Sequence, residues 1–425
     1  MGKPATSDRR AYRPLCLLIC GGALSGNKGA IAMTLTVARE IRAIVPGCRL
    51  RLLSKDPAHD AALAAQEGIE LVTARPRQLL TTTLVRSLAA SCLPRDRRSL
   101  LWDGILRAYA EADCVVDVTG VSFSDDATWR TWLLGIGWLL PALATGTPYT
   151  KLSQTLGPFR KPLNRWLARQ LLPRCGLIIT RGEQAQREVS ELLGLDPPCP
   201  VCADTAFLLE PASDATVDAE LRAVGAPIRG FVGVSPSAIV AWKSESRQKG
   251  GATTYRQVMC DLIEYILKST GLPVVIVPHA AERALGPVDY ELSREVCAGL
   301  PAEAPVFLLS GEQDPWLLKG IITRAEAFVA CRFHALVAAL SSGVPTLAVG
   351  WGHKYVDAMK LFGVAEFHHN FADISDDKLR VSFSRLWEQR EMLRARLRAL
   401  LPAVQDSARE NFRLLYAFWK AKGLV

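Results

Sequence analysis

Arginine and histidine side chains stand at the ends of several apolar runs in this sequence. Arg332 and His334 lie two residues apart, between the strand-like run 326–331 and the helix-like run 335–343. A buried strand end suits two cations where an anion binds, because the helix N-terminus also favours negative charge. Arg332 can hold a carboxylate or phosphate through two parallel hydrogen bonds, and His334 can exchange a proton near neutral pH. The structural alternative is that Arg332 pairs with an internal carboxylate and His334 caps the helix.

Three further strand ends carry similar groups. Arg181 and His279 each follow a strand-like run, and Asn27 and Lys28 lie in the glycine-rich loop 21–29. That loop matches neither the P-loop pattern nor GxGxxG. Because ligands of open α/β sheets bind at the carboxyl ends of the strands, these sites together predict one pocket for a ligand with several negative charges. A surface ion pair for Arg181 and a plain hydrogen bond for His279 are the competing interpretations.

One lysine and two carboxylates complete the set of candidates. Lys354 follows a strand-like run and either reaches a phosphate or is simply solvated. Asp204 and Asp117 lie in apolar surroundings, where a carboxylate must be paired, hydrogen-bonded or shifted in its pKa. Asp204 either activates a hydroxyl as a general base or only tethers the segment between domains. No DxD or HExxH pattern and no Cys/His cluster with ligand spacing is present, so we expect no metal.

The elements that must position these groups alternate along the chain. Short β-branched runs are separated by helix-like segments, which predicts parallel sheets with helices on both faces. A polar, turn-rich joint near residue 212 divides the series into two. We predict α/β domains at residues 1–212 and 213–375, facing one cleft, and a helical segment at residues 376–425. The polar stretch 239–257 lacks periodicity and is predicted to be a mobile loop over the cleft.

Composition narrows the class of protein. The chain has 425 residues, 49% hydrophobic and 22% charged, which is typical of a globular protein with two domains. A net charge of +9 indicates a generally basic surface or attraction to anionic substrates or membrane lipids. The basic residues are spread along the chain, which disfavours nucleic acid. The eleven cysteines lie mostly inside apolar runs, which predicts reduced, buried thiols and a cytoplasmic location.

One apolar stretch bears on membranes. The stretch 132–146 contains a proline and is too short to span a bilayer, so it predicts a buried helix first and a membrane-touching face second. The tryptophans of residues 129–138 and the basic charge permit a peripheral contact at the inner face of a membrane.

Taken together, the motifs resemble those of the polysaccharide pyruvyl transferase family. The matching segments, in family order, are GNKGAIAM, SQTLGPF, IITRGEQAQREVSELLG, ADTAFLL, VVIVPHAA and CRFHALVAALSSGVPTLAVGWGHK. The resemblance covers roughly residues 15–363. It implies two Rossmann-like domains in a GT-B-like arrangement and transfer of pyruvate from phosphoenolpyruvate to a sugar as a ketal. It implies no cofactor beyond this donor.

The resemblance also assigns roles to residues. Arg332 and His334 match the family's Arg-x-His and would contact phosphoenolpyruvate on the second domain, and Arg181 matches its other anion-binding arginine. Lys28–Gly29 stands where the family often has Gly-Asp, and segment 117–126 lacks the fuller glycine run, so the acceptor on the first domain stays open. The predicted catalytic residues are His334 and Asp204. The predicted substrate ligands are Arg332, Arg181, His279, Lys354, Asn27 and Lys28.

Two rival functions remain. A GT-B glycosyltransferase using a nucleotide sugar would also suit the turn at 341–350, and an inactive scaffold in polysaccharide assembly would keep the fold. The expected partners are phosphoenolpyruvate and a lipid-linked or nucleotide-linked glycan.

Overall fold

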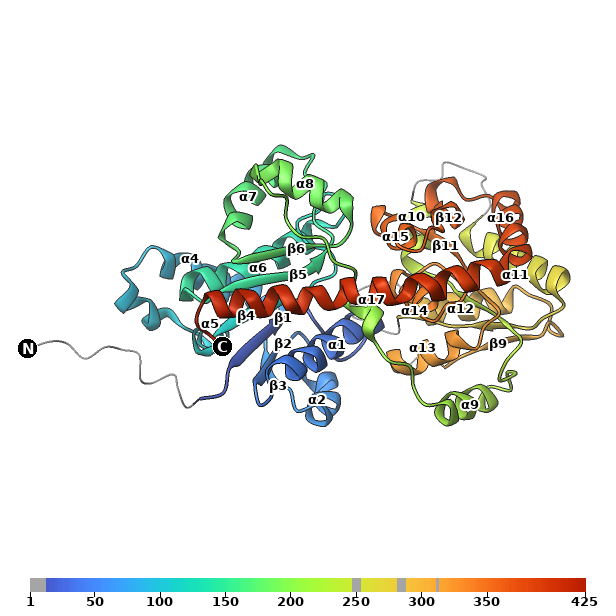
Figure 1. Cartoon of the computed structure of the whole chain (residues 1–425), viewed down its shortest axis with the longest axis horizontal. Helices are drawn as coiled ribbons and strands as arrows, with labels where there is room; N and C mark the ends of the chain where they lie inside the picture. The colour runs from blue at the N-terminus through green and yellow to red at the C-terminus, as the bar shows by residue number, and fades with distance from the viewer. Residues whose placement is uncertain (1–12, 247–253, 281–287, 311–312) are drawn as a thin grey trace, which may run out of the picture.

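The computed structural model describes residues 13–246, 254–280, 288–310 and 313–425. Two six-stranded parallel sheets form the framework, with strand orders β3-β2-β1-β4-β5-β6 and β12-β11-β10-β7-β8-β9. Helices cover both sheets, so the prediction of two Rossmann-like α/β domains is confirmed (Figure 1).

The first domain contains the following elements. Its strands are β1 (Cys16–Cys20), β2 (Arg49–Ser54), β3 (Glu70–Thr73), β4 (Cys114–Asp117), β5 (Tyr149–Gln154) and β6 (Leu177–Thr180). Its helices are α1 (Lys28–Ile44), α2 (Pro57–Gln66), α3 (Pro76–Gln78), α4 (Leu84–Ser91), α5 (Gly104–Glu111), α6 (Trp129–Thr145), α7 (Pro162–Leu171) and α8 (Glu183–Leu193). Short turns of helix are η1 (Leu79–Thr83), η2 (Arg95–Leu101), η3 (Leu172–Arg174) and η4 (Thr205–Leu208).

The second domain repeats this plan. Its strands are β7 (Val232–Ser235), β8 (Val274–Ile276), β9 (Val306–Leu308), β10 (Ala327–Ala330), β11 (Thr346–Gly350) and β12 (His368–Asn370). Its helices are α9 (Asp214–Ala223), α10 (Ala238–Glu245), α11 (Tyr255–Thr270), α12 (Asp289–Ala298), α13 (Pro315–Thr323), α14 (Phe333–Ser341) and α15 (His353–Lys360). Two helical turns, η5 (Ala365–Phe367) and η6 (Phe371–Asp373), flank β12, and α16 (Asp376–Glu388) and α17 (Arg390–Ala421) end the chain.

The central strands are apolar because both faces of each sheet are covered. Every residue of β1 (CLLIC) and of β10 (AFVA) is buried. Parallel strands covered on both faces need such continuous apolar runs rather than alternation. In each sheet the chain order reverses between the two central strands, β1 and β4 in the first and β7 and β10 in the second. Loops that leave these strands open the crevice in which ligands of this architecture bind.

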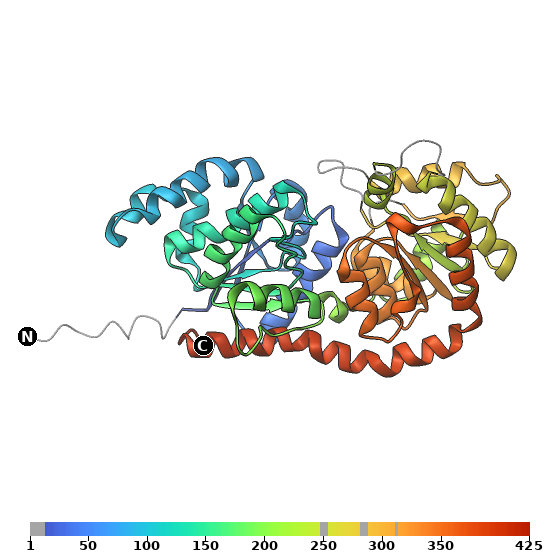
Figure 2. The same cartoon turned by 90° about the horizontal axis from the view of Figure 1, so that it is seen from above.

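Helix α17 ties the two domains together. It runs along both of them and brings the C-terminus back to the first domain (Figures 1 and 2). The Asn411 side chain accepts a hydrogen bond from the Ser153 N–H at 2.9 Å and donates to the Ala203 carbonyl at 3.1 Å. The C-terminal helices were expected from the sequence, but their contact with the first domain was not.

Two other expectations meet the structure here. The stretch 239–257 is not a continuous loop, because α10 begins at Ala238 with the Ser237 hydroxyl accepting from the Val240 N–H. Residues 247–253 of that stretch lie outside the described residues.

The apolar stretch 132–146 forms most of α6 and its C-cap, and its Trp132 and Trp138 are 5% and 2% exposed. Within the described ranges, no helix has the length and apolar character that a membrane span requires. The boundary at residue 212 falls between β6 and β7 and stays a prediction.

Candidate functional site

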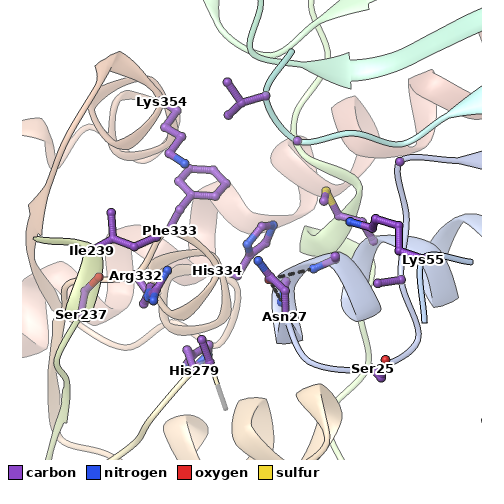
Figure 3. A pocket seen from close by; sticks show the side chains of 18 of the residues that line it. Ser25, Asn27, Lys55, Ser237, Ile239, His279, Arg332, Phe333, His334 and Lys354 are labelled. Carbon is purple, nitrogen blue, oxygen red and sulfur yellow. Dashed lines mark hydrogen bonds between the residues drawn. The ribbon is translucent and has the colours of Figure 1, made fainter. Parts of the chain in front are cut away.

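A cavity of about 410 Å³ opens between the two domains at the carboxyl ends of both sheets (Figure 3). Its polar and aromatic lining comes from both domains, and every contributing loop leaves a strand at its carboxyl end. Its lining includes Ser25, Asn27, Gly29, Lys55, Ser237, His279, Arg332, Phe333, His334, Trp351 and Lys354.

Arg332 follows β10 and stands at the N-cap of α14. Its Nε and Nη2 donate to the two carboxylate oxygens of Asp289, each at 2.6 Å. Asp289 is fully buried and also accepts from the Ala238 N–H at 2.9 Å. The internal pairing considered for Arg332 is therefore present, but it uses only two nitrogens. In the described part of the chain Nη1 has no hydrogen-bond partner, and the side chain lines the cavity with 16% of its surface exposed.

His334 is the second residue of α14 and lies in the same corner of the cavity. Its Nε2 is buried and has no hydrogen-bond partner among the described residues. The ring packs on α1 of the other domain, since a Cβ at Gly29 would lie 1.8 Å from Nδ1. Burial lowers the pKa of His334 to about 4, although Asp204 acts in the opposite direction. The imidazole is therefore neutral at pH 7, and one buried ring nitrogen is left to meet a ligand.

His279 follows β8 on the floor of the cavity. Its Nδ1 lies 3.4 Å from the Ser235 hydroxyl and 3.4 Å from the Val277 carbonyl, which are long contacts. Burial lowers its pKa to about 3. His279 is thus a second neutral imidazole beside Arg332, as both interpretations from the sequence allowed (Figure 3).

Lys354 begins α15 on the opposite side of Phe333 from His334 (Figure 3). Its Nζ lies 4.7 Å from the Trp351 ring centre and 5.2 Å from that of Phe333. Burial, together with the charges of Arg181 and Arg332, lowers the pKa of Lys354 to about 7. Aromatic faces stabilise the ammonium form. An anion in the cavity would raise this pKa and fix the charge.

Asn27 and Lys28 begin α1 but point to different places. The Asn27 Oδ1 accepts from the N–H groups of Gly29 and Ala30 at 3.0 and 3.2 Å, so Asn27 caps the helix at the cavity wall. Its backbone also bridges to Ala280 of the second domain. Lys28 is 8% exposed and lines a small separate cavity behind His334. Asn27 and Lys28 therefore line different cavities.

Arg181 and Asp204 form a buried pair behind this wall. The Arg181 Nη1 donates to Asp204, Nη2 to the Gly120 carbonyl at 2.7 Å, and Nε to the Thr155 hydroxyl at 3.3 Å. Burial would raise the pKa of Asp204, but the Arg181 charge holds it below its ordinary value. Both residues line a second cavity, of about 360 Å³, and neither lines the main one. The structure therefore does not bring Arg181 and Asp204 to the ligand-facing surface on which the sequence placed them.

Arg181 still acts on the main cavity through Phe333. Its guanidinium lies 4.5 Å from the Phe333 ring centre, and that ring forms the wall between Lys354 and His334. The pair thus holds the wall in place and supplies part of the charge that His334 and Lys354 experience.

Asp117 belongs to an internal network. The Lys151 Nζ donates to it at 2.6 Å and the Tyr149 hydroxyl at 2.7 Å, and Asp117 and Lys151 are fully buried. Gly21 passes so close that a Cβ there would lie 1.9 Å from the Thr119 hydroxyl, which explains the glycine after β1. This network shapes the loop but does not face the ligand space.

Several lining residues were not predicted as site residues, among them Lys55, Ser237, Phe333 and Trp351. Lys55, Ser237 and Trp351 follow β2, β7 and β11, and Phe333 stands between the predicted Arg332 and His334. Each could have been found by applying the strand-end rule to all residue types rather than to cations first. In the ranges that the structure describes, no three His, Cys, Asp or Glu side chains gather as metal ligands would.

Comparison with known proteins now places the chain. The arrangement is that of a two-domain α/β enzyme with a GT-B-like fold, and several solved structures share it. The S. aureus MnaA–UDP co-structure matches with a TM-score of 0.60 and 11% identity, over 97% of this chain and 98% of that one. Anabaena Alr3699/HepE in complex with UDP-glucose matches with a TM-score of 0.59 and 14% identity, over 95% and 100%. A putative UDP-N-acetylglucosamine 2-epimerase from Listeria monocytogenes matches with a TM-score of 0.60 and 13% identity, over 96% of each chain.

These likenesses show the fold alone. The sequence itself matches the family model for polysaccharide pyruvyl transferase over residues 27–353, and no curated protein matches it. The protein therefore belongs to the polysaccharide pyruvyl transferase family, as its motifs predicted, and is a transferase of that family.

Proposed function

We propose that this protein transfers pyruvate from phosphoenolpyruvate to two hydroxyls of one sugar, in a cell-surface polysaccharide or its precursor, as a ketal. The observation that carries the proposal is one corner of the cavity. There, Nη1 of Arg332 has no hydrogen-bond partner among the described residues. The buried Nε2 of His334, two residues further along the chain, also has no partner among them. Family membership supports the same reaction.

The donor fits the charges of the second domain. Phosphoenolpyruvate carries a carboxylate and a phosphate on a small frame. Arg332 supplies a permanent cation held rigidly by Asp289, and Lys354 supplies one that strengthens when an anion arrives. The N-termini of α14 and α15 add the positive ends of two helix dipoles. We assign the carboxylate and phosphate to this side, with His279 as a neutral hydrogen-bonding group.

The reaction uses two hydroxyls and moves two protons, one to the methylene carbon of the donor and one to the departing phosphate. One hydroxyl attacks C2 of phosphoenolpyruvate while the methylene carbon takes a proton and becomes a methyl group. The second hydroxyl then attacks C2, the C2–O bond to phosphate breaks, and phosphate leaves. His334 carries the proton to the methylene carbon, because the bound dianion raises the pKa of an imidazole that is neutral in the free protein. The donor brings its own leaving group, so we expect no cofactor.

The acceptor then lies against the first domain, where Ser25, Asn27 and Lys55 line the cavity. Structural neighbours solved with UDP or UDP-glucose support a nucleotide-linked acceptor. They equally suit the alternative, a glycosyltransferase whose donor is a nucleotide sugar. Asp204 stays a proposed catalytic residue only through its charge on His334, since it does not line the main cavity.

The experiment combines protein, phosphoenolpyruvate and a panel of nucleotide-linked and lipid-linked sugars. We expect release of phosphate and a mass gain of one pyruvate less water on one acceptor. His334→Gln should keep donor binding and lose product, whereas His369→Gln, on β12 beside Ser382, should match the wild type. Thermal stabilisation by a nucleoside diphosphate but not by phosphoenolpyruvate would favour the glycosyltransferase. Absence of phosphate release with crude acceptor would favour a scaffold.

A further inference from the structure

Helix α7 presents large apolar side chains to solvent. Leu163 and Trp166, three residues apart on one side of the helix, are 66% and 58% exposed. Only Ala168 of this helix is buried. Figure 1 shows α7 beside the β6 edge of the first sheet, on the far side of that domain from α2. In Figure 1 helix α8 lies between α7 and the second domain.

Basic residues predominate around α7, although Asp125 and Asp126 lie beside its start, where Asp126 pairs with Arg160 at 3.2 Å. Residues 127–182 contain eight Arg and Lys and no Asp or Glu, so this stretch alone carries +8 of the chain's net +9. Lys151 and Arg181 of this set are buried. The exposed ones are Arg130, Arg160, Lys161, Arg165, Arg169 and Arg174. The net excess of positive charge attracts an anionic surface and disfavours a second copy of the same face.

A third large apolar residue lies next to the helix. The Asp125 carboxylate accepts from the Lys161 N–H at 2.7 Å and from the Asn164 amide, so the chain before α6 is fastened to the start of α7. Trp129, four residues after Asp125, is 68% exposed and carries Arg130 over its ring at 5.7 Å. Of the tryptophans expected at a membrane, only Trp129 is on the outside, since Trp132 and Trp138 are buried.

We infer that this face, formed by Trp129, Lys161, Leu163, Arg165 and Trp166, docks on an anionic lipid surface. Lysine and arginine contact the headgroups while tryptophan and leucine enter the headgroup–acyl boundary, the pattern of interfacial helices. A nucleic acid would need a basic groove that follows its backbone, and the exposed Leu163 would contribute nothing to the binding of a nucleic acid. The inference rests on the surface alone and holds whether or not the proposed reaction is right.

Sedimentation with vesicles tests the inference on the full chain. We expect binding to vesicles of phosphatidylcholine mixed with phosphatidylglycerol, weakened by salt, and little binding to phosphatidylcholine alone. Leu163→Ser with Trp166→Ser should lower the partition coefficient about tenfold, because two inserted side chains are lost. Lys161→Glu with Arg165→Glu should lower it at least as much. Val381→Ser, which removes a 69% exposed side chain from α16, is the matched control and should change nothing.

Several outcomes would overturn the docking face. Serine variants that bind like the Val381→Ser control would show that the apolar residues do not enter the membrane. Equal binding to both kinds of vesicle would remove the role of charge. A concentration-dependent dimer that the serine variants abolish would assign the face to a second copy of this chain instead. Turnover of a water-soluble acceptor by the serine variants should stay at the wild-type level, which separates this test from that of the reaction.

Discussion

Arg181 and Arg332 occupy matching positions in the two domains and are used differently. Each follows a strand and precedes a helix. All three nitrogens of Arg181 donate to internal acceptors, and the side chain lies outside the main cavity. Arg332 donates from Nε and Nη2 to Asp289 and leaves Nη1 for the ligand space, with 16% of its side chain exposed.

A position at the end of a strand is therefore not enough to make an arginine bind a ligand. Each domain supplies a buried carboxylate, but only the first adds the Thr155 hydroxyl and the Gly120 carbonyl. The acceptors that surround a guanidinium decide whether any donor is left for a substrate. The same sequence signature thus gives a positioning residue in one domain and a candidate binding residue in the other.

Removing Arg181 should have the largest effect on stability. Arg181→Ala leaves Asp204, which is 1% exposed, without its cation, and breaking a buried pair costs about 3–5 kcal/mol. Urea unfolding would measure the loss. Arg181→Met with Asp204→Asn should recover part of it, because no unpaired charge stays buried. A single variant as stable as the wild type would contradict the assignment of Arg181 to the framework.

Removing Arg332 should lower stability as well, because Asp289 would stay buried without its cation, and it should also weaken binding of the donor. Arg332→Ala is expected to lose about 3 kcal/mol of donor binding, roughly a hundredfold in kcat/KM. Calorimetry with phosphoenolpyruvate and steady-state kinetics would show it. Arg324→Ala is the matched control, since Arg324 is an 8% exposed arginine of the same domain that pairs with Asp218 and does not line the cavity. If both variants bind the donor equally well, Arg332 is as structural as Arg181.

The sequence predicted the parallel sheets and the cations at the strand ends better than the partners of those cations. Parallel sheets and strand-end cations follow from local patterns, because apolar runs and loop residues are read position by position. The partners of the arginines could not be predicted in the same way. Asp289 lies 43 residues before Arg332 and Asp204 lies 23 after Arg181, so only the folded chain reveals which donors are already used.

The contact between Gly29 and His334 could not be predicted for the same reason. Nothing in the residues around α1 indicates that its first turn meets an imidazole of the other domain. The exposed α7 face was missed because the tryptophans of α6 gave the stronger local signal, although most of them pack inside.

A smaller effect is expected where the two domains meet. Gly29→Ala places a Cβ 1.8 Å from the His334 Nδ1, so the ring or α1 must shift. Overpacking of this kind costs about 1–3 kcal/mol, against a gain of up to about 1 kcal/mol in helix propensity. We expect net destabilisation and a lower kcat. Gly104→Ala, at the start of α5 with nothing within 4 Å, should instead be neutral or stabilising.

The mildest test separates the two cations that face the donor. The pKa of Lys354 is lowered to about 7 by burial and by neighbouring arginines, whereas Arg332 keeps its charge at every working pH. Above pH 7 the Lys354 ammonium loses its proton, so the Kd for phosphoenolpyruvate should rise, approaching tenfold per pH unit. Lys354→Arg should flatten that rise, and exposed Lys360→Arg should leave it intact. If the pH profile stays unchanged in Lys354→Arg, the donor anion is held by Arg332 without Lys354. The second domain would then bind the donor with one cation, Arg332, whereas the first domain keeps its arginine, Arg181, in an internal pair.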